Sequence, residues 1–267
     1  MKTIGISLHS SIGNSRSNQE DNYMVPSSGA MSLGGIHINA NRNDDIVLNY
    51  TIPASDFAVA VSDGMGGHAS GEIASYMTVR YLSDNYARVV DGEKTELINL
   101  ISEINSEVVR ESRSCPDYKG MGATLCGLLC RDGKLLGFNV GDSRLYRYDS
   151  HGLKRLSRDH SEGQRLLDLK LLTEEEVKNF PNRKTIYKYI GMRADLVADV
   201  FDVEPCREKT VFLLCSDGLS DVLDESELSL ILSSDVPLKQ KSDMLMNRAL
   251  SRNVGHGDNI TIILTEF

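Results

Sequence analysis

Residues 57–64 read Phe-Ala-Val-Ala-Val-Ser-Asp-Gly, and residues 211–218 read Val-Phe-Leu-Leu-Cys-Ser-Asp-Gly. Each segment is a short apolar run typical of a buried strand, and each run stops at an aspartate followed by a glycine. A single Asp-Gly pair is an ordinary turn signal. Two pairs in the same setting predict two buried strands that each present a carboxylate where the strand ends.

Further acidic residues stand at the ends of other strand-like runs, namely Glu20, Asp21, Asp142 and Asp258. Because strand ends on one edge of a sheet converge, we expect these carboxylates to gather, where they repel one another unless a cation neutralises them. Oxygen donors with few histidines favour Mg2+ or Mn2+ over zinc. Two such ions can activate a water for attack on a phosphoryl group. Arg16, just ahead of Glu20, can hold the phosphate oxygens.

The remaining apolar periodicity predicts the order strands, two helices, strands, two helices, strand. Helices are expected at 70–86, 94–111, 225–232 and 238–250, and further strands at 4–8, 123–130, 135–140, 145–148, 153–156, 196–203 and 260–265. Consecutive helices after strands argue against strict β-α-β alternation. We therefore predict an α+β fold in a single domain over 1–267, an α-β-β-α sandwich of two antiparallel sheets flanked by helix pairs.

Composition excludes several classes of function. The 267 residues carry a net charge of −9, which disfavours nucleic acid and anionic membranes as general partners. The five cysteines are odd in number and mostly apolar in setting, which favours free thiols in a reducing compartment. No apolar stretch approaches the ~18 residues of a membrane span. We expect a cytoplasmic protein.

Seven segments, in order along nearly the whole chain, resemble the metal-dependent protein phosphatase family, also called protein phosphatase 2C. They are Arg16-Ser17-Asn18-Gln19-Glu20-Asp21, Asp63-Gly64-Met65-Gly66-Gly67-His68, Gly122-Ala123-Thr124, Gly141-Asp142-Ser143-Arg144, Asp159-His160-Ser161, Ser216-Asp217-Gly218-Leu219-Ser220-Asp221 and Gly257-Asp258-Asn259-Ile260-Thr261. The Asp-Gly-Met-Gly-Gly form is similar to the bacterial branch. The family's fold, two antiparallel sheets with helices outside, agrees with the order of elements above.

The resemblance implies a phosphoserine/phosphothreonine phosphatase that uses two Mn2+ or Mg2+ ions and no organic cofactor. It implies phosphoprotein substrates, a serine/threonine kinase acting on the same targets, and a monomeric signalling enzyme. By position, Asp63 would bridge the two ions and Gly64 would offer its carbonyl. The other implied roles are metal ligation by Glu20, Asp217 and Asp258, a third metal at Asp142 and Asp221, phosphate binding by Arg16, and support of the ligands by Asp21.

The chain departs from the family pattern in three places. Some members carry a histidine, proposed as general acid, where this chain has Met65, and we do not transfer that role to His68. The stretch 26–55 is longer than the family's usual connection and suggests an extra hairpin or loop. The segment 162–190 matches the family's flap beside the active site, which we expect to help choose substrates.

Two other functions fit parts of the sequence. Residues 64–69 match the loose nucleotide-binding pattern G-x-G-x-x-A, with Asp84 about 20 residues on, although a second helix rather than a parallel strand follows. The same fold could also serve as a phosphoprotein-binding pseudophosphatase, but every matched metal position is acidic. A cysteine phosphatase is excluded, because no cysteine is followed six residues later by arginine.

Overall fold

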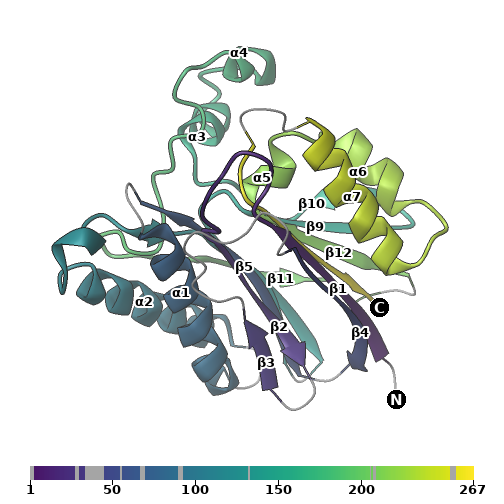
Figure 1. Ribbon diagram of the computed structural model, residues 1–267, viewed down its shortest axis with the longest axis horizontal. Helices are drawn as coiled ribbons and strands as arrows, with labels where there is room; N and C mark the ends of the chain where they lie inside the picture. Colours follow the sequence, from purple (N-terminus) through teal and green to yellow (C-terminus); the bar gives the residue numbers. More distant parts are fainter. Residues whose placement is uncertain are drawn as a thin grey trace.

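The computed structural model describes residues 3–27, 30–33, 45–54, 56–66, 70–89, 93–131, 133–204, 206, 209–252 and 257–267. Two antiparallel sheets pack face to face, with helices on the outer side of each, as Figure 1 shows. This arrangement confirms the α+β sandwich that the sequence predicts. None of the helices in the described part of the chain combines the length and the apolar character that a membrane span needs.

The first sheet has the strand order β10-β9-β12-β13-β1-β4. Its strands are β1 (Thr3–Ser11), β4 (Ile46–Pro53), β9 (Arg144–Asp149), β10 (Gly152–Arg155), β12 (Val211–Cys215) and β13 (Ile260–Glu266). The outer side of this sheet is covered by α5 (Asp217–Ser220), α6 (Glu225–Leu232) and α7 (Leu238–Arg252). The short helix α5 starts directly where β12 ends, so the Asp-Gly pair after this strand also opens a helix.

The second sheet has the strand order β11-β8-β7-β5-β2-β3. Its strands are β2 (Asp21–Ser27), β3 (Ala30–Leu33), β5 (Phe57–Met65), β7 (Leu125–Arg131), β8 (Lys134–Val140) and β11 (Asp199–Val203), while β6 (Gly122–Ala123) pairs only with the end of β5. Its outer side is covered by α1 (Gly71–Asn85) and α2 (Lys94–Glu111). Single 3-10 turns follow these helices, η1 (Tyr86–Arg88) and η2 (Pro116–Tyr118).

Side-chain alternation along the strands divides the apolar residues between inner and outer layers. In β5, Phe57, Val59 and Val61 join the core between the sheets, while Ala58 and Ala60 face the cluster that includes α1 and α2. The small alanines let the helices approach the sheet closely. Burial on both faces explains why this strand reads as a continuous apolar run.

The predicted helices agree closely with the observed ones, and α2 and α6 have the expected bounds. The long stretch 26–55 contributes one strand to each sheet. β3 forms a hairpin with β2, and β4 pairs antiparallel with β1. The sequence analysis did not predict β4. Residues 34–44, where an extra hairpin or loop is expected, lie outside the described residues.

The predicted flap contains two short helices, α3 (Glu162–Asp168) and α4 (Glu174–Lys178), which project from the sandwich in Figure 1. Thr173 caps α4: Glu176 N donates to the Thr173 side chain, while the Glu176 carboxylate accepts from the Thr173 backbone. This reciprocal pair is the capping box that the Thr-Glu-Glu-Glu run predicts.

Candidate active site

Five strand ends meet at one end of the sandwich and bring their carboxylates together. A cavity of about 290 Å3 lies there. The predicted site residues that line it are Arg16, Glu20, Asp63, Gly64, Asp142, Asp217 and Asp258. Residues more than 200 positions apart in the chain, such as Arg16 and Asp258, are in direct contact at this cavity, with Arg16 Nη2 2.7 Å from Asp258 Oδ2.

The local backbone explains why Asp63 is followed by glycine. Asp63 N donates to Thr124 Oγ1 at 2.9 Å, and Gly64 N donates to the Glu20 carbonyl at 3.0 Å. A Cβ atom on Gly64 would lie 2.1 Å from the carbonyl oxygen of Gly71, where α1 begins. Only glycine allows the strand end and the helix start to approach this closely.

Asn259 holds the loop that carries Arg16 and Glu20. Its Oδ1 accepts from Glu20 N at 2.7 Å, and its Nδ2 donates to the carbonyls of Ile12 and Asn18 at 3.0 Å each. The side chain is buried, so these bonds are shielded from water. In the sequence Asn259 is only one residue of a matched segment. Its hydrogen bonds to the loop are seen only in the structure.

Asp21 lies behind the cavity rather than in it. Its carboxylate accepts from Ser216 Oγ at 2.6 Å, and Ser216 Oγ in turn accepts from Thr261 N at 3.0 Å. Burial raises the pKa of Asp21 to about 7. The bond to Ser216 fixes the residue directly before Asp217, which fits the supporting role that the resemblance implies for Asp21.

The cavity carboxylates are electrostatically strained. Burial, followed by the charges of Asp21 and Asp217, raises the pKa of Asp63 well above its ordinary value. Burial also raises the pKa of Asp142 well above its ordinary value and that of Asp217 to about 7. Burial raises the pKa of Glu20 to about 7 as well, against the opposing charge of Arg16. These groups cannot all be ionised near neutral pH without added positive charge.

The donor set fits a hard divalent cation. Asp217 Oδ1 is buried and has no hydrogen-bond partner within the described part of the chain. The residues that line the cavity offer carboxylate and carbonyl oxygens and include no histidine or cysteine. Among the described residues, no three acidic, histidine or cysteine side chains already converge as a finished coordination shell.

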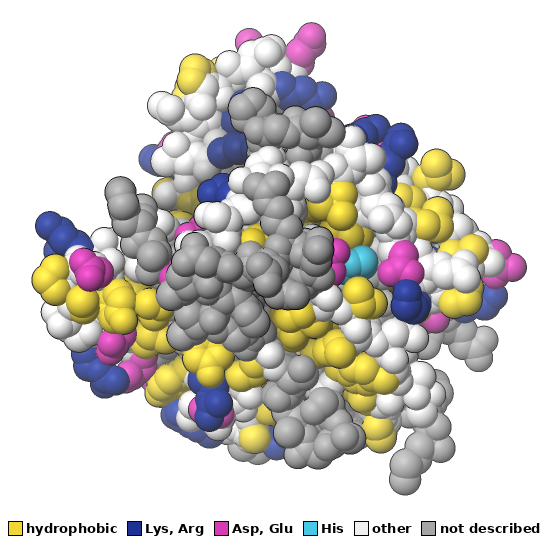
Figure 2. All heavy atoms as spheres, viewed as in Figure 1, with side chains coloured by type: hydrophobic (Ala, Val, Ile, Leu, Met, Phe, Trp, Pro, Cys, Tyr) yellow, Lys and Arg dark blue, Asp and Glu magenta, His cyan; other side chains and the backbone are white. Residues whose placement is uncertain are grey.

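A second cavity, of about 570 Å3, continues from the first beneath the flap. Asp142 and Asp217 line both cavities, and Asp221 lines only the second. Lys184 of the flap donates to Asp221 through its Nζ. No motif marks Lys184, so sequence reading could not find this contact. Figure 2 shows basic side chains gathered around the flap on this face of the molecule.

His160, a histidine of the matched segments, does not line the metal cavity. His160 Nδ1 accepts from Gly141 N at 3.0 Å, which holds the residue before Asp142 in place, so His160 is a positioning residue. His68 lies outside the described residues. The nucleotide-binding interpretation fails because β5 pairs antiparallel with both β2 and β7, and a dinucleotide-binding unit needs parallel strands.

Comparison with known proteins agrees with this geometry. The family model described as protein phosphatase 2C matches residues 34–253. The serine/threonine phosphatase stp of Listeria monocytogenes is 38% identical over 213 residues, which cover 78% of this chain and 83% of that protein.

Two solved structures have the same fold. The serine/threonine phosphatase of S. agalactiae superposes with a TM-score of 0.81 at 27% identity, covering 98% of this chain and 99% of that one. The catalytic domain of the phosphatase PstP, solved in complex with two manganese ions, superposes with a TM-score of 0.73 at 24% identity over 99% of each chain. At this level of identity, the similarity to PstP shows a shared fold only.

Proposed function

The chain belongs to the protein phosphatase 2C family, and we propose that its carboxylate-lined cavity is the metal centre of a serine/threonine phosphatase. The protein is a metal-dependent hydrolase that removes phosphate from phosphoserine and phosphothreonine with Mn2+ or Mg2+. One observation carries the assignment of residues: Glu20, Asp63, Asp217 and Asp258 gather around one cavity beside Arg16.

Each carboxylate has a role that its place in the fold supports. Asp63 would contribute to both core ions, since the charges of four neighbouring carboxylates, Asp21, Asp142, Asp217 and Asp258, act on it. Gly64 offers its backbone carbonyl, and Glu20, Asp217 and Asp258 supply the remaining protein ligands. Asp142 and Asp221 would hold a third ion, since both line the cavity beneath the flap. Bound divalent ions of this kind supply an activated water and neutralise charge on the phosphoryl group.

Arg16 binds the phosphate. It is the one cationic side chain among the described residues that line the metal cavity, and its contact with Asp258 holds it at the cavity edge. A guanidinium can hold two phosphate oxygens at once. Met65 also lines the cavity and carries no titratable proton, so it cannot protonate the leaving hydroxyl oxygen.

The finer setting of the enzyme is also a proposal. We propose a single catalytic domain over 1–267, with 162–190 as a flap that contributes to the choice of substrate. The substrates are phosphoproteins, and a serine/threonine kinase phosphorylates the same targets. Five free cysteines support a reducing, cytoplasmic location. We propose that the enzyme acts as a monomer.

Metal binding tests the assignment directly. Equilibrium dialysis with Mn2+ should show at least two ions bound to the wild-type protein and a clear loss of bound ions in Asp63→Asn. The control variant Asp84→Asn changes an exposed carboxylate that pairs with Arg80 on α1 and should bind Mn2+ as the wild type does. A wild-type protein that binds no Mn2+ would favour the pseudophosphatase, a phosphoprotein-binding module with the same fold.

A further inference from the structure

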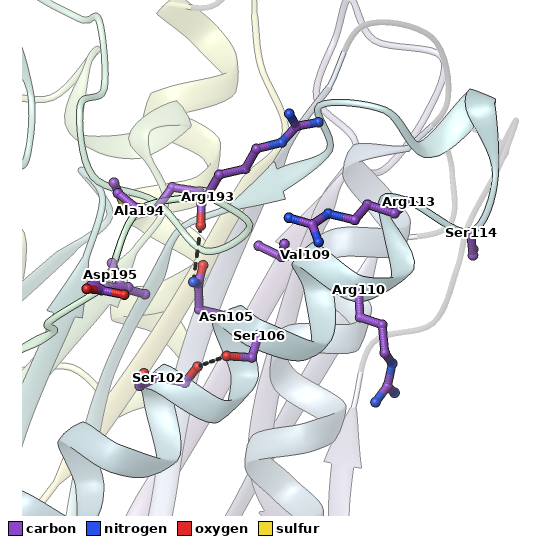
Figure 3. A pocket seen from close by; sticks show the side chains of 12 residues that line it. Ser102, Asn105, Ser106, Val109, Arg110, Arg113, Ser114, Arg193, Ala194 and Asp195 are labelled. Atoms are coloured by element: carbon purple, nitrogen blue, oxygen red, sulfur yellow. Dashed lines mark hydrogen bonds between the residues drawn. The ribbon is translucent and has the colours of Figure 1, made fainter.

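A separate cavity of about 430 Å3 lies between the second half of α2 and residues 192–196. It shares no lining residue with the metal cavity or with the cavity beneath the flap. Its charged lining residues are Arg110, Arg113, Arg193 and Asp195, and we call it the arginine pocket. In Figure 3 the Arg113 side chain extends from the end of α2 and the Arg193 side chain extends from the facing segment, while Arg110 points away from both.

Two arginines of this pocket lack the partners that arginines have elsewhere in the molecule. Arg110 forms an ion pair with Glu107, three residues earlier on α2. Within the described ranges, Arg113, Arg183 and Arg193 are the arginines without a carboxylate partner. The arginines that do form such pairs are Arg16, Arg80, Arg88, Arg110, Arg131, Arg144, Arg147, Arg155, Arg158, Arg165, Arg248 and Arg252. Two of the three unpaired guanidinium groups therefore border one cavity.

The wall that carries Arg193 is held by hydrogen bonds. Asn105, buried on α2, accepts from Gly191 N at 2.7 Å and donates to the Met192 carbonyl at 3.1 Å. Gly191 has a φ of 98°, which favours glycine, and Leu196 is buried in the core cluster beneath α2. The segment is thus fixed on both sides of Arg193, so less backbone freedom is lost when a ligand binds.

The charge of the pocket selects for anions. Arg113 and Arg193 contribute two positive charges that nearby carboxylates do not balance, and Asp195 is the one acidic lining residue. This contrasts with a net charge of −9 for the whole chain. Guanidinium groups bind carboxylates and phosphates through charge-assisted, often bidentate, hydrogen bonds. Both arginines are exposed, so the ligand can be part of a larger chain that lies on the surface.

The backbone connects the pocket to the metal cavity over a short path. Ile190, directly before the pocket segment, pairs with Ala123 through two hydrogen bonds of 2.8 and 2.9 Å. Ala123 in turn pairs with Gly64, which lines the metal cavity. These pairings are buried, and they fix the position of the arginine pocket relative to the metal cavity.

We propose that the arginine pocket binds an acidic segment of the phosphoprotein substrate, separate in sequence from the phosphorylated residue. The proposal rests on the proposed function, because it assigns a specificity site to the same phosphatase. Arg113 and Arg193 contact carboxylate or phosphate groups of the substrate and lower KM for acidic proteins. They take no part in the hydrolysis itself.

Peptides that differ only in charge at a distance test this proposal. Each contains one phosphothreonine, a flexible Gly-Ser spacer of about 12 residues that spans about 20 Å on average, and a block of four glutamates or four glutamines. The block is placed on either side of the phosphothreonine in separate peptides. Wild-type enzyme should show a lower KM for a glutamate peptide, and Arg113→Gln/Arg193→Gln should raise that KM about fivefold with unchanged kcat.

Three controls separate this effect from a general loss of activity. The double variant should hydrolyse p-nitrophenyl phosphate and the glutamine peptides at wild-type rates. Asp195→Asn, which removes the opposing charge, should lower KM for the glutamate peptide. The preference for glutamate should also disappear at 0.5 M NaCl, because the contacts are exposed and are screened by salt.

Two results would contradict the proposal. Equal KM values for glutamate and glutamine peptides in the wild type would show that acidic segments are not selected. An undiminished glutamate preference in the double variant would place the selection elsewhere, with the flap cavity as the next candidate. An enzyme that fails to hydrolyse even p-nitrophenyl phosphate would contradict the proposed function instead, so the two failures can be told apart.

Discussion

Two groups of carboxylates at the same end of the molecule have their charge balanced in opposite ways. Beneath the flap, buried Asp159 contacts Arg144 at 2.6 Å and Arg155 at 3.5 Å, and Asp199 contacts His160 and Lys188 at 3.1 and 2.7 Å. In the metal cavity, Asp63, Asp142 and Asp217 form no ion pair with any described residue. The negative charge of the first group is balanced by cationic side chains of the protein, and that of the second group is not.

The pKa values express this difference. The close contact with His160 lowers the pKa of Asp199 to about 2, whereas burial raises the pKa of Asp217 to about 7. The same residue type is stabilised as an anion in one place and destabilised in the other. The first arrangement supports the fold, and the second stores an electrostatic strain that a bound cation relieves.

The largest expected effect comes from neutralising a carboxylate of the metal cavity. Asp217→Asn should lower kcat by about 1,000-fold or more, at least as much as the loss of one charge-stabilising group in other active sites. The metal-free variant should be as stable as the wild type or more stable, because a strained negative charge is gone. Phosphate release and thermal unfolding measure the two quantities. Full Mn2+-dependent activity would contradict the ligand assignment.

Removing a cationic partner from the paired group should instead lower the stability of the protein. Arg144→Leu leaves buried Asp159 with only the longer contact to Arg155, and should lower the free energy of unfolding by about 3 kcal/mol. Urea denaturation of the metal-free protein checks this. The matched variant Arg158→Gln removes an exposed partner of Asp168 and should have a much smaller effect. Equal effects of the two substitutions would contradict the claim that the buried ion pair of Asp159 stabilises the fold.

Arg16 lies in the metal cavity but takes part in an ion pair, with Asp258, in a half-exposed position. It therefore combines a feature of each group. Arg16→Lys keeps the charge but loses one charge-assisted hydrogen bond to phosphate, which is worth about 1.5 kcal/mol. We expect kcat/KM for p-nitrophenyl phosphate to fall about tenfold with little change in stability. An unchanged kcat/KM would mean that Arg16 serves only to pair with Asp258.

A further expected effect is on the pH dependence of stability without metal. Raised pKa values of about 7 for Glu20 and Asp217 mean that the folded state takes up protons between pH 7 and about 4, where the unfolded chain does not. Stability of the metal-free protein should therefore rise as the pH falls from 8 to 5. The lowered pKa of Asp199 contributes stability that is lost only below about pH 4.

Thermal unfolding with EDTA and with saturating Mn2+ measures this dependence. Mn2+ should abolish or reverse the rise in stability at lower pH, because bound ions compete with protons for the same carboxylates. A metal-free protein that becomes less stable between pH 8 and 5 would contradict the account of strained carboxylates.

The sequence predicts the carboxylates of the metal cavity better than the paired group beneath the flap. Glu20, Asp63, Asp142, Asp217 and Asp258 could be found because each stands where an apolar run stops, and strand ends converge. The partners Arg144 and Asp159 lie 15 residues apart, and nothing in residue spacing shows that a guanidinium from β9 meets a carboxylate at the flap boundary. Such pairs depend on tertiary packing.

The same dependence on tertiary packing limits what the sequence predicts of the fold. α6 has the bounds that its apolar spacing predicts, because a 3.6-residue period marks a helix buried on one side. β4 was missed within the long stretch 26–55, although its side chains alternate between half-buried and exposed. Its partner, β1, is distant in sequence, and only that pairing makes the segment a strand.

Phosphate release from a phosphothreonine peptide is the most direct test of the central claim, that the unpaired carboxylates are a metal centre for phosphoester hydrolysis. The assay compares Mn2+, Mg2+ and EDTA, with Asp63→Asn as the matched control for contaminating phosphatases. We predict release that requires a divalent ion and is lost in the variant. No release by a folded wild-type protein with either ion, or equal release by Asp63→Asn, would contradict the account.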